Sequence, residues 1–292
     1  MPPNPTPHGK SHCALESDVI PKHPSDLQYA DTASYINRYA PAASARILDV
    51  GCGSGGLAAL LGAAGHAVTA IDASETAVEK ARKKGIPAQQ ADLLEYQGGP
   101  FDVVLFSYAL HHISPLDQAL EKVRSVLAPG GRVILEEFGI DRVDAPTAAW
   151  FFGTQDVLVA EGLLEDTDPS GVLEGKDPMA RWRERFEPGR HGHGGQGPGK
   201  HGHGGHDHRG HGREGHGQFS ERLHEGSAMR AGIAGSFRIL YEASAPALAR
   251  FWLHRLPKSA LPVARQLAAL EKLLIAQGVI RAFGFRIVAE LA

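Results

Sequence analysis

Short apolar runs alternate with longer amphipathic stretches through the first half of the chain. The runs are rich in branched or aromatic residues and are bounded by turn residues, as buried strands are. The strongest of them is FDVVLFS, residues 101–107. The stretches between the runs have helical length and end at glycine or at a Pro-Gly-Gly stop. This alternation predicts right-handed βαβ units and a parallel sheet, with strands at 45–50, 66–72, 86–93, 101–107 and 132–138.

Three helices are expected between these strands. Glycines open the first, at 53–65. Ser74 is the expected N-cap of the second, at 74–85. Ser114 is the expected cap of the third, at 114–131, with a proline at its first helical position.

Outside this alternating part the pattern divides the chain further. Residues 1–25 are polar and proline-rich and predict a flexible N-terminal tail, after which a helix runs up to Pro41. Residues 26–292 form the predicted folded domain, and residues 141–218 form an insertion that caps it. Two late strands with helices between them are predicted at 236–243 and 283–291.

Composition and charge narrow the class of protein. With 292 residues, of which 42% are hydrophobic, the chain suits one large α/β domain or two small ones. A net charge of −3 and the lack of a basic face argue against nucleic-acid or membrane-surface partners. The chain starts without the apolar segment of a secretory signal and has no run of about 18 apolar residues. We therefore expect a soluble, cytoplasmic protein.

The stretch ILDVGCGSGG, residues 47–56, leaves the first strand and enters the first helix. Glycines there allow a tight turn and let a ligand lie against bare backbone at a helix N-terminus. Their spacing fits a dinucleotide loop as well as a GxGxG loop. Asp49 would repel a pyrophosphate but suits an ammonium group, Asp72 suits ribose hydroxyls, and Asp92 suits an adenine amino group. These carboxylates favour a cationic adenosyl ligand over a dinucleotide.

The chain resembles the class I S-adenosylmethionine-dependent methyltransferases over roughly residues 29–140. The resemblance lies in ILDVGCGSGG, VTAIDAS, QADLLEY, and FDVVLFSYALHHI followed by SVLAPGGRVILEEF. It implies S-adenosyl-L-methionine as cofactor. It also implies a Rossmann-like α/β fold with helices on both faces of a seven-stranded sheet, order 3-2-1-4-5-7-6 and strand 7 antiparallel. The two late strands then fit strands 6 and 7.

The resemblance also implies roles by position. The methionine end of the cofactor, its ribose and its adenine would lie against Asp49, Asp72 and Asp92, respectively. Tyr108 would face the transferring methyl group, and His111 or His112 would lie at the substrate mouth. The full set implied to bind the cofactor is Asp49, Gly51, Cys52, Gly53, Asp72, Ala73, Asp92, Leu93 and Ser107.

Some of these residues have a structural interpretation as well. Asp72 can cap the following helix while it binds the ribose. Asp92 can be an ordinary loop carboxylate, and Cys52 can be a small residue that fills the turn. Tyr29 and Tyr35, on the N-terminal helix, either close over the cofactor or pack in the core.

Candidates for a general base lie after the fourth and fifth strands. His111 and His112 can act as a base or can pack against the next helix. Glu136 and Glu137 alternate on the fifth strand, so only one of them faces the site. Methyl transfer from a sulfonium depends mainly on positioning the acceptor, so a dedicated base is optional.

The acceptor is expected to be a small molecule. The motif after strand 4 is not of the Asn/Asp-Pro-Pro-aromatic type, which in this family supports methylation of amino groups on bases or glutamine. That strand is also not followed by a cysteine that could attack a pyrimidine ring. We expect the acceptor pocket between the N-terminal helix and the 141–218 insertion. Four aromatic residues of that insertion would roof the pocket or pack the cap: Trp150, Phe151, Phe152 and Trp182.

A histidine- and glycine-rich run at 190–217 holds half of the sixteen histidines. Imidazoles bind zinc, nickel and copper, so an alternative function is metal binding, with weak divalent-metal affinity expected at 191–216. A cofactor-binding homologue without catalysis is a further alternative. The run interrupts the chain between strands 5 and 6 and contains none of the cofactor motifs. These features favour a disordered loop on a methyltransferase.

Overall fold

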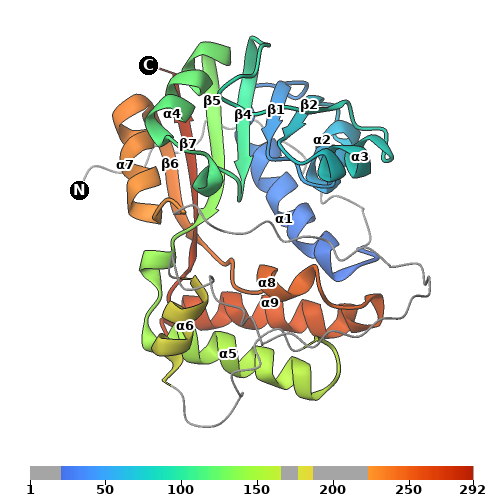
Figure 1. The fold of residues 1–292 in the computed structure, drawn as a ribbon, viewed down its shortest axis with the longest axis vertical. Helices are drawn as coiled ribbons and strands as arrows, with labels where there is room; N and C mark the ends of the chain where they lie inside the picture. The colour runs from blue at the N-terminus through green and yellow to red at the C-terminus, as the bar shows by residue number, and fades with distance from the viewer. Residues whose placement is uncertain (1–20, 166–176, 187–222, 292) are drawn as a thin grey trace, which may run out of the picture.

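A seven-stranded sheet forms the centre of the computed structural model, which describes residues 21–165, 177–186 and 223–291 (Figure 1). The strand order is β3-β2-β1-β4-β5-β7-β6. Strand β7 is antiparallel to both of its neighbours, and the other pairs are parallel. The order and the antiparallel strand predicted from the sequence are confirmed. The strands are β1 Arg46–Val50, β2 Ala67–Asp72, β3 Ala88–Gln90, β4 Phe101–Ser107, β5 Leu127–Phe138, β6 Arg238–Ala245 and β7 Gly284–Glu290.

Helices cover both faces of the sheet because the central strands are apolar on both sides. Val103 and Leu105 of β4 are fully buried in the core on one face, and the alternate residues Val104 and Phe106 are fully buried on the other. The first face is covered by α1 Pro24–Tyr39, α2 Gly56–Ala63 and α3 Glu75–Arg82, and the second by α4 Leu116–Val126 and α7 Gly226–Ser236.

A helical cap lies beyond the carboxyl ends of the parallel strands, at the bottom of Figure 1. Its aromatic core is buried, and Phe151 stacks on Trp252 with ring centroids 5.2 Å apart. Phe151, Phe152 and Trp182 pack inside this core, so they hold the cap together. The cap helices are α5 Ala145–Ala160, α6 Pro178–Phe186, α8 Arg250–Leu253 and α9 Leu261–Ala276. Half of the cap therefore comes from the β6–β7 connection, beyond the predicted 141–218 insertion.

Two predicted helix starts differ from the structure. Helix α1 begins at Pro24, inside the segment predicted as a tail, because the ring of His23 and the carboxylate of Asp26 form a capping box. Helix α4 begins at Leu116, and Pro115 rather than Ser114 is its N-cap residue because its backbone is extended. That helix ends at Val126, and the following Pro-Gly-Gly segment already belongs to β5.

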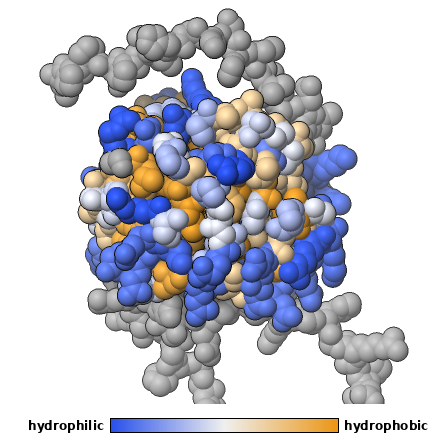
Figure 2. Space-filling model, turned by 90° about the horizontal axis from the view of Figure 1, so that it is seen from above, coloured by the Kyte–Doolittle hydropathy of each residue, from blue (hydrophilic) through white to orange (hydrophobic). Residues whose placement is uncertain are grey.

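The face opposite the cap mixes hydrophobic and hydrophilic residues (Figure 2). A hollow of about 710 Å³ lies at the amino ends of the strands, beside Arg46, Ala67 and Pro87. Its lining contains no residue that the sequence assigns to the cofactor or to catalysis. Within the described ranges, no helix is long and apolar enough to cross a membrane. Predictions for residues 1–20 and 190–217 lie outside the described part of the chain.

Candidate active site

The predicted cofactor residues gather at the carboxyl ends of β1, β2, β3 and β4. The chain that leaves β1 is tied to β2, since the amides of Gly51 and Cys52 donate to the carbonyl of Ile71 at 2.8 and 3.1 Å. The chain that leaves β3 is tied to β2 as well, since the amide of Ala91 donates to the carbonyl of Asp72 at 3.1 Å. Parallel pairing thus brings residues from four separate motifs to one edge of the sheet.

The glycine loop adopts a backbone that side chains disfavour. Gly51, Gly53 and Gly55 have φ values of 71°, 54° and 73°. A Cβ on Gly51 would lie 2.6 Å from the Cβ of Ala109, so this loop touches the segment that follows β4. A Cβ on Gly53 would meet no atom within 4 Å, so bare backbone faces open space there. A ligand can therefore lie directly against the loop at Gly53.

Asp72 holds the loop in place. Its Oδ2 accepts from the amide of Gly53 at 2.8 Å, and its Oδ1 accepts from the amide of Ser74 at 2.9 Å. Ser74 is the N-cap of α3, as the sequence predicts. Each carboxylate oxygen has a second lone pair, so the half-buried Asp72 can still accept from ribose hydroxyls. The neighbouring Ala73 is exposed, and its carbonyl accepts from Gln90 at 3.2 Å.

Asp49 is a buried carboxylate with an unused acceptor. The residue is 1% exposed, and its Oδ2 has no hydrogen-bond partner. Burial raises the pKa of Asp49 to about 7, and the negative charge of Asp72 adds to the rise. An ammonium group placed here would satisfy the oxygen and restore the charged form. This unpartnered carboxylate beside the glycine loop therefore fits the methionine end of S-adenosylmethionine, which carries an ammonium group.

Cys52 and the residues after β3 complete this side of the site. Burial, followed by the charges of Asp49 and Asp72, raises the pKa of the Cys52 thiol to about 12, so the thiol stays protonated. Asp92 is exposed, and its Oδ1 accepts from the amide of Leu94 at 2.8 Å. Leu93 is 3% exposed and packs in the main core. The Leu93 side chain is thus committed to the core, and its carbonyl accepts from the amide of Tyr96 at 3.2 Å, so its backbone amide is the group left for a ligand.

Tyr29 and Tyr35 of α1 lie in different surroundings. Tyr29 packs its ring against Gly56, at the start of α2 and beside the glycine loop. Tyr35 is buried on the α1 face of the sheet, with Arg286 4.6 Å above its ring. Its hydroxyl donates to the carbonyl of Leu135 at 3.4 Å. Tyr35 therefore packs in the core, and Tyr29 lies near the cofactor loop.

The end of β4 carries a strained residue. Ser107 is half-buried at the strand end, and Tyr108 has a φ of 58°, the one positive value outside glycine in the described part of the chain. Such a backbone is unfavourable for a bulky residue and recurs at functional sites. The amide of Tyr108 donates to the carbonyl of Glu136 at 2.8 Å, and Arg250 lies 3.7 Å above the Tyr108 ring. Burial raises the pKa of Tyr108 well above its usual range, which keeps the phenol protonated.

His111 forms a buried pair with Glu137. The His111 Nδ1 lies 2.7 Å from Glu137 Oε2, and the two residues are 4% and 0% exposed. The other oxygen of Glu137 accepts from the amide of Leu110 at 2.7 Å. His112 is exposed and its ring lies 4.0 Å from that of His111; desolvation of the ring and then the charge of His111 lower the pKa of His112 to about 4. Of the two histidines, His111 is the buried one.

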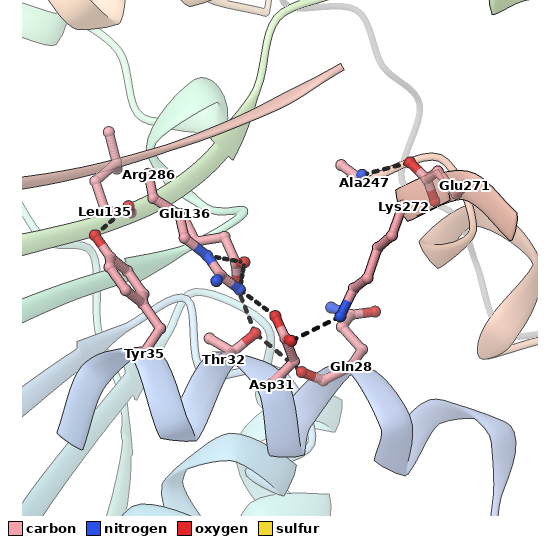
Figure 3. A network of polar contacts seen from close by, with 10 residues as sticks. All are labelled: Gln28, Asp31, Thr32, Tyr35, Leu135, Glu136, Ala247, Glu271, Lys272 and Arg286. Atoms are coloured by element: carbon pink, nitrogen blue, oxygen red, sulfur yellow. Dashed lines mark hydrogen bonds and ion pairs between the residues drawn. The ribbon is translucent and has the colours of Figure 1, made fainter. Parts of the chain in front are cut away.

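Glu136 points to the opposite side of the sheet and borders a cavity of about 70 Å³. The cavity lies between α1, the end of β5 and the helices α8 and α9. Glu136 accepts from Arg286 Nε at 2.8 Å and from the hydroxyl of Thr32 (Figure 3). Asp31 joins Arg286 to Lys272, whose Nζ lies 3.0 Å from Asp31 Oδ1 (Figure 3).

This cavity differs in its lining from the acceptor pocket that the sequence predicts, and the position of that pocket stays a prediction. Its lining comes from α1, Tyr108 after β4, β5, the segment before α8, α8 and α9, and it includes no residue of the 141–218 insertion. The sequence interpretation missed Asp31, Arg250, Lys272 and Arg286. Arg286 had a signal in the sequence, because it is a charge in the middle of a mostly apolar strand. The other three look like ordinary helix-surface charges.

The Rossmann-like sheet, the left-handed glycine loop and the carboxylates at the strand ends define a class of enzyme fold. Residues 26–193 match the family described as "Methyltransferase domain", which is more than half of the chain. The protein belongs to this family, within the class I S-adenosylmethionine-dependent methyltransferases.

Individual relatives match shorter stretches. A ubiquinone biosynthesis O-methyltransferase of Caulobacter sp. is 38% identical over 108 residues, which cover 34% of this chain and 43% of the relative. A malonyl-[acyl-carrier protein] O-methyltransferase of Erwinia pyrifoliae is 33% identical over 134 residues, which cover 43% and 50%. The chain thus spans half or less of the length of these two relatives. A crystal structure of a Pyrococcus horikoshii protein is 15% identical with a TM-score of 0.47, covering 92% of this chain and 90% of that one.

Proposed function

We propose that the protein transfers a methyl group from S-adenosylmethionine to a small-molecule acceptor. The observation that carries this proposal is the buried carboxylate of Asp49, with its unpartnered Oδ2 beside bare glycine backbone. In this proposal Asp49 binds the ammonium group, Asp72 the ribose hydroxyls and Asp92 the adenine amino group. The cofactor supplies a methyl group that its sulfonium already activates.

The acceptor side is proposed to use the segment after β4. Glu137 holds the His111 ring by its Nδ1, which leaves the Nε2 to take a proton from an acceptor. Tyr108 is proposed to face the reacting methyl group and to present an uncharged, protonated phenol to it. Both relatives described above are named as O-methyltransferases. A hydroxyl acceptor agrees with a neutral imidazole as base.

A methyl-transfer assay tests the proposal. The protein is incubated with methyl-labelled S-adenosylmethionine and a panel of phenols, hydroxy acids and amines, and labelled product is separated. Label in at least one acceptor is expected, with loss of about 100-fold or more in rate for His111→Gln. His112→Gln is the matched control and should keep most of the rate. Cofactor binding without transfer to any acceptor would favour a non-catalytic homologue.

The metal-binding alternative gains no support from the described residues. Within residues 21–165, 177–186 and 223–291, no group of three or more His, Cys, Asp or Glu side chains is arranged to hold a metal ion. Residues 191–216 lie outside those ranges, so weak metal binding there stays a prediction.

A further inference from the structure

The cavity beside Glu136 is lined by charged side chains that mostly satisfy one another. Asp31 pairs with Lys272 and Arg286, and Arg286 also pairs with Glu136. Glu271 is 1% exposed, and its carboxylate accepts from three consecutive backbone amides, the first at Ala247 and 2.8 Å away. Every carboxylate in the wall is therefore already engaged.

Arg250 is the exception in this wall. Its guanidinium lies over the Tyr108 ring, with Cζ 3.7 Å from the ring centroid, and its Nη1 is buried without a hydrogen-bond partner. Among the charged residues that line the cavity in the described chain, Arg250 alone has neither an ion pair nor a side-chain hydrogen bond. The Tyr108 phenol stays protonated, so it offers a π face but no negative charge.

A buried guanidinium donor without an acceptor is unfavourable unless a ligand supplies the acceptor. The planar guanidinium matches a carboxylate in geometry and charge. The cavity of about 70 Å³ has room for such a group, and Leu27 and Leu253 give apolar wall for the carbon atoms next to it.

We propose that Arg250 forms an anion subsite and that the methyl acceptor carries a carboxylate bound there. Tyr108 joins the two parts of the site, because it lies between the end of β4 and Ala109, which borders the glycine loop, and its ring also lies under Arg250. The carboxylate would thus anchor the acceptor on the Arg250 side of Tyr108. The reacting atom of the acceptor would lie on the other side of Tyr108. This inference rests on the proposed methyl transfer for the identity of the ligand as acceptor.

The test compares two probes of equal shape. Benzoate and neutral benzamide are titrated by ligand-observed NMR into the full chain saturated with S-adenosylhomocysteine. Benzoate is expected to bind at least about tenfold more tightly than benzamide. Arg250→Met should lose this preference, Arg250→Lys should keep only part of it, and Lys258→Met, an exposed residue outside the cavity, should keep all of it. Equal binding of the two probes, or full benzoate affinity in both Arg250 variants, would overturn the subsite.

Two further readouts separate this inference from the proposed function. The affinity for S-adenosylhomocysteine should be the same in wild type and in folded Arg250→Met, as judged by circular dichroism. A parallel loss of that affinity would place Arg250 at the cofactor instead and overturn an acceptor subsite. Benzoate selectivity in a protein that binds no S-adenosylhomocysteine would refute the methyltransferase proposal while upholding the anion site.

Discussion

His111 and Glu137 form a buried pair, with the imidazole Nδ1 2.7 Å from the carboxylate. The residues come from different elements, the turn after β4 and the end of β5, and meet because these strands are neighbours in the sheet. A carboxylate at Nδ1 fixes the proton on that nitrogen and leaves Nε2 as the acceptor. The pair therefore sets both the orientation and the tautomer of His111.

Glu137→Gln tests this pair. The amide keeps the shape but removes the charge from a buried hydrogen-bonded group, so the free energy of unfolding should fall by about 1–3 kcal/mol. Urea unfolding measures this change. Glu121→Gln, on the exposed surface of α4, is the matched control and should be neutral. Equal stability of the two variants would show that the His111–Glu137 pair contributes nothing to the fold.

Asp49 predicts a pH dependence of cofactor binding. Its pKa is raised to about 7 by burial and then by Asp72, whereas a bound ammonium group requires the ionised form. Below that pH the free protein must release a proton on binding, so affinity should rise about tenfold per pH unit towards pH 7 and then level. Calorimetry with S-adenosylhomocysteine between about pH 5.5 and pH 7.5 measures this rise.

Two substitutions identify the carboxylate responsible. Asp49→Asn should bind weakly at every pH in that range, with the rise removed. Asp92→Asn should keep the rise, because it removes an exposed carboxylate and leaves the buried Asp49 carboxylate in place. A flat wild-type profile would contradict the assignment of Asp49.

A matched pair of glycines separates ligand contact from backbone strain. Gly53 and Gly85 have φ values of 54° and 79°, and a Cβ on either would meet no protein atom within 4 Å. Alanine at each position should therefore lower the free energy of unfolding by a similar amount, about 1–2 kcal/mol. Only Gly53→Ala should also weaken S-adenosylhomocysteine binding, because its methyl group would occupy ligand space. Equal affinities in the two variants would argue against a ligand at the loop.

His66 predicts lower stability in acid. Its Nδ1 accepts from the amide of Ala45 at 3.1 Å, and its Nε2 lies 3.0 Å from Asn37 Oδ1, so the ring is held neutral. Burial lowers the pKa of His66 below its usual value near 6.5. The unfolded chain therefore takes up a proton first, and stability should fall as pH drops below about 6.5. Urea titrations at several pH values should show a smaller decline in His66→Ala, and an identical decline would refute this role.

The sequence predicted the sheet correctly, and it also predicted which strand ends bring Asp49, Gly53 and Asp72 together. Asp49, Gly53 and Asp72 lie in one continuous βαβ unit, so their meeting at the strand ends follows from local pattern and parallel pairing. The two late strands were placed as strands 6 and 7 through the resemblance, and the structure confirms that order. The roles of the individual site residues stay predictions.

The cap and the acceptor side depend on contacts between distant residues. Arg250 and Asp31 are more than two hundred residues apart in sequence and border one cavity. Neither α1 nor the four-residue α8 carries a local signal that says which elements it will face. The left-handed backbone of Tyr108 likewise has no local signal, since it depends on the Glu136 carbonyl and on the packed cap.

The most direct test of the account is calorimetry of S-adenosylhomocysteine with wild type and with Asp72→Ala. The account predicts roughly micromolar binding by the wild type and a loss of about 10-fold to 100-fold in the variant, because a charged acceptor for the ribose is removed. Circular dichroism of the variant checks that α3 and the loop tied to Asp72 remain folded. No binding by the wild type, or unchanged affinity in a folded Asp72→Ala, would contradict the central claim that this loop and its carboxylates form a methyltransferase cofactor site.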